Sequence, residues 1–178
     1  KALRGQYLVM KSIEELKNGF RNGQIEKQDF IHQMHEIHQC LFDYAKVIKD
    51  TDIARIEIQD DSVVMTTREL GIKIICDQYD ERIIPLEIIN FGEFEGEEQR
   101  VIRSLIKSDW TIFDVGANIG WYSLNLAKSF SGLKIHAFEP IPSTFKYLQS
   151  NLALNEVSGV EAHNFGLSNT GGTKEMYF

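Results

Sequence analysis

The sequence predicts an α/β protein in which a doubly wound parallel sheet, truncated on its C-terminal side, follows a helical hairpin and a small antiparallel β segment. Three observations predict this class. Strand and helix patterns alternate from about residue 110 onward, as they do in doubly wound sheets. The first strand of that region leads into a glycine loop, and the second ends in a glutamate. Both features fall at the carboxyl ends of strands, where such sheets bind ligands.

The composition limits the class of protein. The chain has 178 residues, of which 43% are hydrophobic, enough for one domain with a core and a small appendage. It contains no run of about 18 apolar residues, so no membrane contact is expected. Asp and Glu outnumber Lys and Arg by 26 to 19, for a formal charge of −7, and no nucleic-acid partner is expected. Cys40 and Cys76 form no motif, which indicates reduced thiols and a cytoplasmic location.

Residues 1–50 are predicted to form a helical hairpin or spacer. Ile13, Leu16 and Phe20 recur at helical spacing. Asn22-Gly23 then breaks the pattern, because both residues tolerate a left-handed backbone. One face of the helix that follows carries Ile31, Met34, His38, Leu41, Ala45 and Ile48. This stripe is expected to pack on another part of the protein.

Residues 51–92 are predicted to form a small β-rich segment. The stretch from Ala54 to Ile58 alternates apolar and polar residues, as a half-buried strand does. Asp60-Asp61 supplies a turn, and residues 63–67 and 72–75 are two further strand candidates. The strand-like pattern extends to about Asn90, and a small antiparallel sheet is expected here.

Residues 93–178 are predicted to form the first half of the parallel-sheet domain. The pattern is helix 97–107, strand 110–115, helix 119–130, strand 133–138, helix 142–155 and strand 160–165. The first strand is continuously apolar, which is typical of strands buried on both faces. Pro142 opens the last helix, where the missing N–H has no cost. A turn at residues 169–172 and the start of another strand follow.

The loop from Asp114 to Gly120 has the pattern G-x-N-x-G. Gly116 and Gly120 let the main chain turn tightly and approach a ligand. The helix that follows favours an anion at its N-terminus. A phosphate loop would need Gly-Lys followed by Ser or Thr, but Trp121-Tyr122 stands there instead. A dinucleotide loop would need glycine in place of Asn118.

Two acidic residues narrow the choice of ligand. Asp114 would repel a pyrophosphate in a poorly solvated crevice and suits a cationic group. Glu139 ends the second strand, 19 residues after Gly120, where it can accept hydrogen bonds from ribose hydroxyls. S-adenosylmethionine has the required ribose, compact amino acid tail and sulfonium. NAD is the alternative ligand.

The stretches D-V-G-A-N-I-G-W-Y and A-F-E-P-I-P resemble the FkbM-type methyltransferases, which use S-adenosylmethionine. The similarity runs from about Ile53 to the end, and it includes F-G-E-F-E at residues 91–95 and N-F-G-L-S-N at residues 164–169. Asn169 departs mildly from the family, which usually has Asp near this position. The resemblance implies a Rossmann-like methyltransferase sheet, of which this chain contains only some of the strands.

The resemblance also implies which residues bind the cofactor. The residues at the methionine end would be Asp114, Gly116, Asn118 and Glu95, and the small residues that keep the loop free of bulky side chains would be Ala117 and Gly120. Glu139 would bind the ribose. The residues around the adenine would be Ile141, Asn164, Phe165 and Gly166. Trp121 and Tyr122 are expected to pack rather than to contact a substrate. No catalytic residue is predicted.

The expected function is methyl transfer to a hydroxyl of a polyketide-type natural product or a sugar. Residues 14–35 are similar to helical spacers of modular polyketide and peptide synthases, in which the acyl substrate would be tethered to a carrier protein. The acceptor groups are expected in a remainder of the domain beyond Phe178, so these residues alone are expected to be inactive. The alternative is a non-catalytic module that serves docking or dimerisation in a larger assembly.

The second helix also carries a histidine cluster. His32, His35 and His38 are three residues apart and therefore span about 120° of the helix surface. The usual metal-binding pair on a helix is spaced by four and is accompanied by a carboxylate motif. We therefore predict partly exposed helix histidines and no metal site.

Overall fold

The computed structural model describes residues 3–77 and 84–173. The chain divides into two compact units, Lys1–Lys49 and Asp50–Phe178, and each is described by itself. Among the described residues, no helix combines the length and apolar character needed to cross a membrane.

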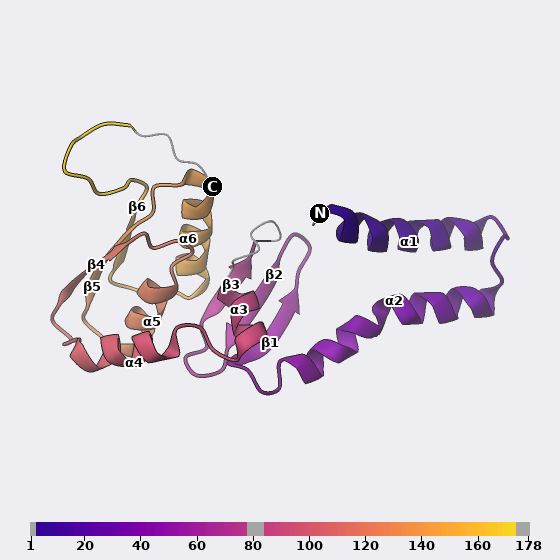
Figure 1. Ribbon diagram of the computed structural model, residues 1–178, viewed down its shortest axis with the longest axis horizontal. Helices are drawn as coiled ribbons and strands as arrows, with labels where there is room; N and C mark the ends of the chain where they lie inside the picture. The colour runs from indigo at the N-terminus through magenta and orange to yellow at the C-terminus, as the bar shows by residue number, and fades with distance from the viewer. Residues whose placement is uncertain (1–2, 78–83, 174–178) are drawn as a thin grey trace. The chain divides into compact units, whose positions relative to one another are not determined.

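The first unit is the predicted helical hairpin (Figure 1). Helix α1 (Leu3–Arg21) and helix α2 (Lys27–Val47) are joined by a turn in which Gly23 has a φ of 69°. Phe20 stacks on Phe30 with ring centroids 4.6 Å apart. The three histidines of α2 are exposed, as is most of its apolar stripe, including Ile31 at 49% and Leu41 at 52%.

The second unit begins with the predicted antiparallel sheet. Strands β1 (Ile53–Ile58), β2 (Val63–Thr67) and β3 (Lys73–Cys76) lie in the order β1-β2-β3. All pairings are antiparallel. The core of this sheet consists of Ile53, Val64, Met65, Ile72 and Ile74.

One predicted element is wrong in type. Residues Ile84–Phe91 form helix α3, whereas the strand-like pattern extended to about Asn90. Pro85 lies in the first turn of the helix, where its missing N–H needs no partner. Ile84 and Ile88, four residues apart, are both buried, so this apolar run follows the helical period. Residues 78–83, the end of the expected β region, lie outside the described residues.

The remainder of the second unit is a parallel sheet with helices. Strands β4 (Thr111–Val115), β5 (Lys134–Phe138) and β6 (Val160–His163) lie in the order β4-β5-β6. Helix α4 (Gly96–Leu105) precedes the sheet, and helices α5 (Trp121–Ser129) and α6 (Pro142–Leu154) connect its strands. The Rossmann-like α/β class is therefore confirmed. The strand expected after residue 172 lies mostly outside the described residues.

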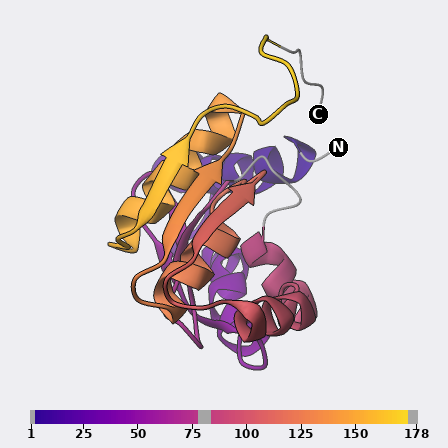
Figure 2. The same cartoon turned by 90° about the vertical axis from the view of Figure 1, so that its left-hand side faces the viewer.

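Helices α5 and α6 lie on the same face of the parallel sheet, which Figure 2 shows with the strands in front. Side chains between these helices and the sheet are buried, among them Ile135 and Ala137 of β5 and Leu148 of α6. On the opposite face Phe113 is 63% exposed and Val115 is 61% exposed. The prediction that β4 is buried on both faces therefore does not hold within the described residues, because their helices cover only one face.

Helix α6 joins the two sheets. The Asn155 amide donates to the main-chain oxygen of Lys73 at 2.6 Å and accepts from its nitrogen at 2.8 Å. One turn earlier, the Asn151 side chain accepts from the nitrogen of Ile75 at 2.9 Å and donates to the oxygen of Ile119 at 3.0 Å. Residues 51–92 and 93–178, separated in the sequence-based division, thus belong to one compact unit.

Candidate functional site

The glycine loop after β4 turns at three residues with positive φ. Gly116 has a φ of 81°, Asn118 of 50° and Gly120 of 95°. The nitrogens of Gly116 and Ala117 both donate to the oxygen of Phe138, at 2.9 and 3.0 Å. These bonds hold the loop against the carboxyl end of β5. The carboxyl ends of β4 and β5, which were expected to share a site, therefore lie next to each other.

The two glycines serve different purposes. A Cβ on Gly120 would lie 2.7 Å from Cδ1 of Leu148, a residue buried in α6. A Cβ on Gly116 would meet nothing within 4 Å. Gly120 is therefore needed for the packing of the loop on α6, whereas Gly116 leaves open space beside the main chain.

Glu139 bridges the loops that follow β4 and β5. Only 4% of this residue is exposed. Its Oε2 accepts from the nitrogen of Asn118 at 3.0 Å, and its Oε1 accepts from the nitrogen of Ile141 at 2.9 Å. An ionised carboxylate has about four acceptor positions. Two are used by the main chain, so the remaining two can accept hydroxyl donors from a ligand.

The loop after β6 reaches the same place. The Asn164 side chain donates to the main-chain oxygen of Glu139 at 2.8 Å. Phe165, 52% exposed, meets the ring of Phe138 edge-on at 5.5 Å. A Cβ on Gly166 would lie 3.6 Å from Cβ of Pro140. The residues expected around an adenine therefore lie beside the residue expected at the ribose.

Asp114 is the next-to-last residue of β4, and its side chain lies on the face that carries the helices. Its Oδ2 accepts from Ser123, at 2.6 Å from the hydroxyl and 3.2 Å from the main-chain nitrogen. Burial raises the pKa of Asp114 above its ordinary value, and the two bonds from Ser123 oppose that rise. The sequence reasoning missed Ser123, whose only signal was a hydroxyl in the first turn of the helix after the loop.

Glu95 has a left-handed main-chain conformation, and its side chain lies near the start of α5. It caps α4 with a φ of 46°, and its exposed carboxylate accepts a short hydrogen bond from the hydroxyl of Tyr122. Desolvation, together with this bond, raises the pKa of Tyr122. Tyr122, which was expected only to pack, thus connects the segment before α4 to the helix that follows the glycine loop.

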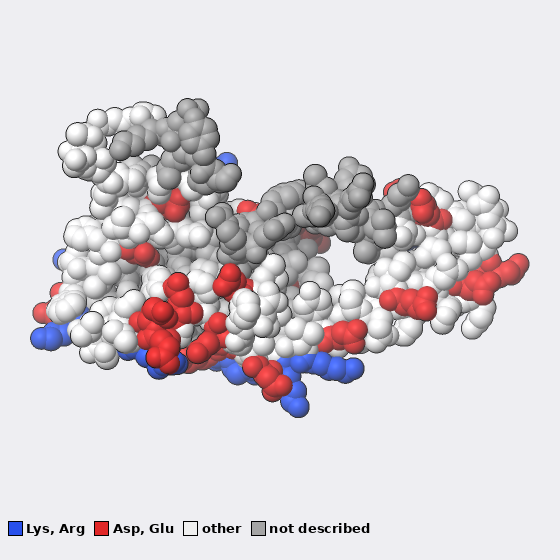
Figure 3. Space-filling view, viewed as in Figure 1, with Lys and Arg blue, Asp and Glu red and all other residues white. Residues whose placement is uncertain are grey.

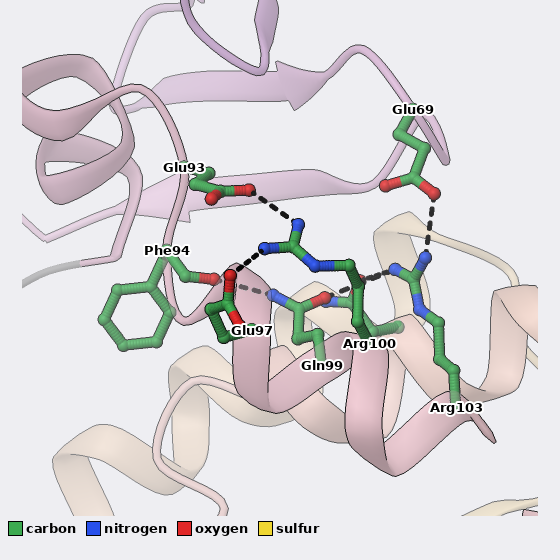
Figure 4. A network of polar contacts seen from close by, with 8 residues as sticks. Glu69, Glu93, Phe94, Glu97, Gln99, Arg100 and Arg103 are labelled. Carbon is green, nitrogen blue, oxygen red and sulfur yellow. Dashed lines mark hydrogen bonds and ion pairs between the residues drawn. The ribbon is translucent and has the colours of Figure 1, made fainter.

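A cavity of about 510 Å³ lies beside the start of α5. Trp121 and Phe94 line it, as do four of the charged side chains that Figure 4 shows, Glu69, Glu93, Arg100 and Arg103. Arg103 donates to Glu69 at 2.8 Å and to Asn125 at 3.0 Å. Other polar contacts here are Arg103 with Gln99 at 3.2 Å, Arg100 with Glu97 at 3.0 Å, Arg100 with Glu93 at 3.5 Å, and Gln99 with the oxygen of Phe94 at 2.7 Å. Its arginines are therefore already paired with acids.

Residues 65–165 match the family described as the TRM5/TYW2 methyltransferase domain. The match runs from β2 through the glycine loop to Phe165, and so it includes nearly every residue of the candidate site. The chain belongs to this family. The site just described is accordingly the glycine loop and the strand ends of a methyltransferase domain.

Curated relatives of this methyltransferase domain match over shorter stretches. The methyltransferase sdnD of Sordaria araneosa is 49% identical over 68 residues, which are 38% of this chain and 26% of the relative. The 31-O-demethyl-FK506 methyltransferase FkbM of Streptomyces tacrolimicus is 37% identical over 67 residues, 38% of this chain and 25% of the relative. The resemblance to FkbM-type methyltransferases is therefore confirmed. The matched stretch is about a quarter of the length of these relatives.

Among solved structures, P. horikoshii TYW2 in complex with MeSAdo is 26% identical to this methyltransferase domain. The alignment covers 78% of this chain and 50% of that chain, with a TM-score of 0.45.

Proposed function

We propose that this chain supplies the S-adenosylmethionine-binding part of a methyltransferase. The observation that carries the proposal is the meeting of three strand ends around Glu139, whose buried carboxylate has acceptor positions left after binding two loops. Family membership independently supports a methyltransferase domain.

The residues at the site fit this cofactor. Asp114 is an acid whose ionisation is disfavoured by burial, so a cationic group nearby would stabilise its charged form. Gly116 leaves space for a compact group beside the loop. Glu139 would accept hydrogen bonds from the ribose, and Ile141, Asn164, Phe165 and Gly166 would surround the adenine. When bound, S-adenosylmethionine supplies an electrophilic methyl group to an acceptor.

For the acceptor we propose a hydroxyl of a polyketide-type natural product or a sugar. The support is the stretch shared with the 31-O-demethyl-FK506 methyltransferase, whose name describes methylation of an oxygen. An RNA acceptor is disfavoured, because the net charge is −7 and nucleic-acid binding is dominated by positive charge near the phosphates. In Figure 3 acidic side chains gather around the N-terminal end of α4, where Glu97 and Glu98 lie.

Calorimetry with S-adenosylhomocysteine tests the cofactor proposal. The 178-residue chain is expected to bind it, and Asp114→Asn is expected to weaken binding by at least about tenfold, which is about 1.4 kcal/mol. Asp109→Asn, at an exposed position just before β4, is the matched control and should bind as wild type does. Binding of NAD in place of S-adenosylhomocysteine would contradict the proposal and favour an NAD-binding domain. A folded chain that binds neither ligand would contradict it and favour a non-catalytic module.

A competition assay tests the acceptor class separately. The full-length protein would be given radiolabelled S-adenosylmethionine with a hydroxylated macrolide, a free sugar or tRNA. Label transferred to the macrolide or sugar supports the proposal. Label on tRNA alone would overturn the acceptor while leaving the cofactor assignment intact.

A further inference from the structure

The open face of the parallel sheet carries a group of side chains that the cofactor site does not use. His136 on β5 pairs in register with Glu161 on β6, and His163 follows two residues later on β6. Because side chains two apart on a strand point to the same face, all three side chains lie on one surface. We propose that His136, Glu161 and His163 form a binding site for a divalent transition-metal ion such as Zn²⁺.

The distances between the ligand atoms suit a zinc ion. Nδ1 of His136 is 3.1 Å from Nε2 of His163 and 3.5 Å from a carboxylate oxygen of Glu161. The other carboxylate oxygen is 3.9 Å from Nε2 of His163. Two ligands bound about 2.0–2.1 Å from a tetrahedral zinc ion are about 3.3 Å apart. One ligand atom from each of the three residues lies within 4.8 Å of the other two, so a small shift of the exposed carboxylate would bring all three within reach of one ion.

The imidazole rings are held in place by aromatic neighbours. Phe113 stacks on His136 with ring centroids 5.4 Å apart, and Phe138 stacks on His163 at 4.8 Å. The histidine side chains are only 29% and 20% exposed, whereas Glu161 is 68% exposed. The two nitrogen ligands are thus fixed on rigid strands, and the carboxylate can move to complete the site. Prearranged ligands lose less conformational entropy when an ion binds.

The facing nitrogens can be held together by a proton or by an ion. At 3.1 Å one ring must donate an N–H to the other, because two facing N–H groups would repel each other. When an ion binds, that hydrogen moves to the other nitrogen of its ring, and both facing lone pairs become ligands.

The ligand set determines the class of ion. Two imidazole nitrogens and a carboxylate oxygen suit zinc and its neighbours in the first transition row, whereas Mg²⁺ and Ca²⁺ prefer oxygen alone. Three protein ligands leave one tetrahedral position for water or another molecule. The sequence pattern for this site is a single His on one strand and E-x-H on the following strand.

The test must first remove competing histidines. Five histidines are present in the chain, and His32, His35 and His38 are exposed on α2. The background protein is therefore the 178-residue chain with these three replaced by alanine, so that only the two sheet histidines remain. Titration with ZnCl₂ by calorimetry should give one ion per chain, and Co²⁺ should produce the intense visible absorption of tetrahedral coordination.

Two variants in this background decide the outcome. Glu161→Gln keeps the size of an exposed side chain and should weaken Zn²⁺ binding at least about tenfold, and His163→Ala should weaken it further. Glu98→Gln, another exposed glutamate, is the matched control and should not change it. Far-UV circular dichroism checks that each variant is folded. The proposal is overturned if the background protein binds no Zn²⁺, if Glu161→Gln binds as tightly as the control, or if Mg²⁺ binds equally well.

Discussion

Asn155 forms two hydrogen bonds with the main chain of Lys73, a residue 82 positions away in the sequence. Its carboxamide presents one acceptor and one donor, as a neighbouring strand would, and so occupies the outer edge of β3. One helical turn earlier, the side chain of Asn151 likewise accepts a hydrogen bond from the main-chain nitrogen of Ile75. An edge that would otherwise present unpaired main-chain groups is thereby attached to helix α6 of the parallel sheet.

Replacing Asn155 with alanine is expected to destabilise the second unit by about 2–4 kcal/mol, because a main-chain donor and acceptor both lose their partner. Asn155→Asp should recover only part of the loss, since it keeps the acceptor and loses the donor. Urea denaturation followed by circular dichroism measures the effect. Gln149→Ala, at an exposed position of the same helix, should change the free energy of unfolding by less than about 0.5 kcal/mol. Equal effects of the two alanine variants would contradict this role.

The two loop glycines should differ in their tolerance of alanine. Gly120→Ala places a Cβ 2.7 Å from Leu148 at a φ of 95°, so backbone strain and overpacking together should cost about 2–4 kcal/mol. Gly116→Ala carries only the backbone strain, because the space around it is open, and should cost about 1 kcal/mol. Denaturant midpoints with unchanged slopes would measure both. The interpretation fails if Gly116→Ala is the more destabilising of the two.

Asp114 should make stability fall as pH rises. Its pKa in the folded state lies above the ordinary value of 3.8 because burial disfavours the charged form. The folded chain therefore loses stability, relative to Asp114→Asn, as pH rises from below 3.8 through the raised pKa of the folded state. We expect Asp114→Asn to be more stable than wild type at neutral pH, with the difference shrinking in acid.

Thermal melting of the two proteins from pH 3 to pH 7 measures this difference. Asp109→Asn is the control for a change at an exposed aspartate. A difference that is constant with pH, or that grows in acid, would show that Asp114 is not destabilised by burial. The expected gain in stability alongside weaker ligand binding is the usual trade between stability and function at a binding site.

Local patterns in the sequence were sufficient to predict most of the helices and strands. The helical hairpin, the small antiparallel sheet and the alternation around residues 111–163 follow from apolar periodicity and from turn residues. The glycine loop and Glu139 were found the same way, because their spacing along the chain is short. Helix α3 was missed, since a short apolar run does not by itself distinguish a strand from a buried helix.

Contacts between distant segments were decided only by the tertiary structure. The sequence could place Asp114 and Glu139 at strand ends, but not Ser123 against Asp114 or Tyr122 against Glu95. It could count histidines on a helix, but not bring His136 and His163 together across two strands. Periodicity specifies which side of an element faces inward, whereas the pairing of particular polar groups depends on sheet register and on how the elements pack. The sequence by itself therefore determined the fold class and the glycine loop. Packing between elements decided how the acids of the candidate site are held and which side chains meet on the open sheet face.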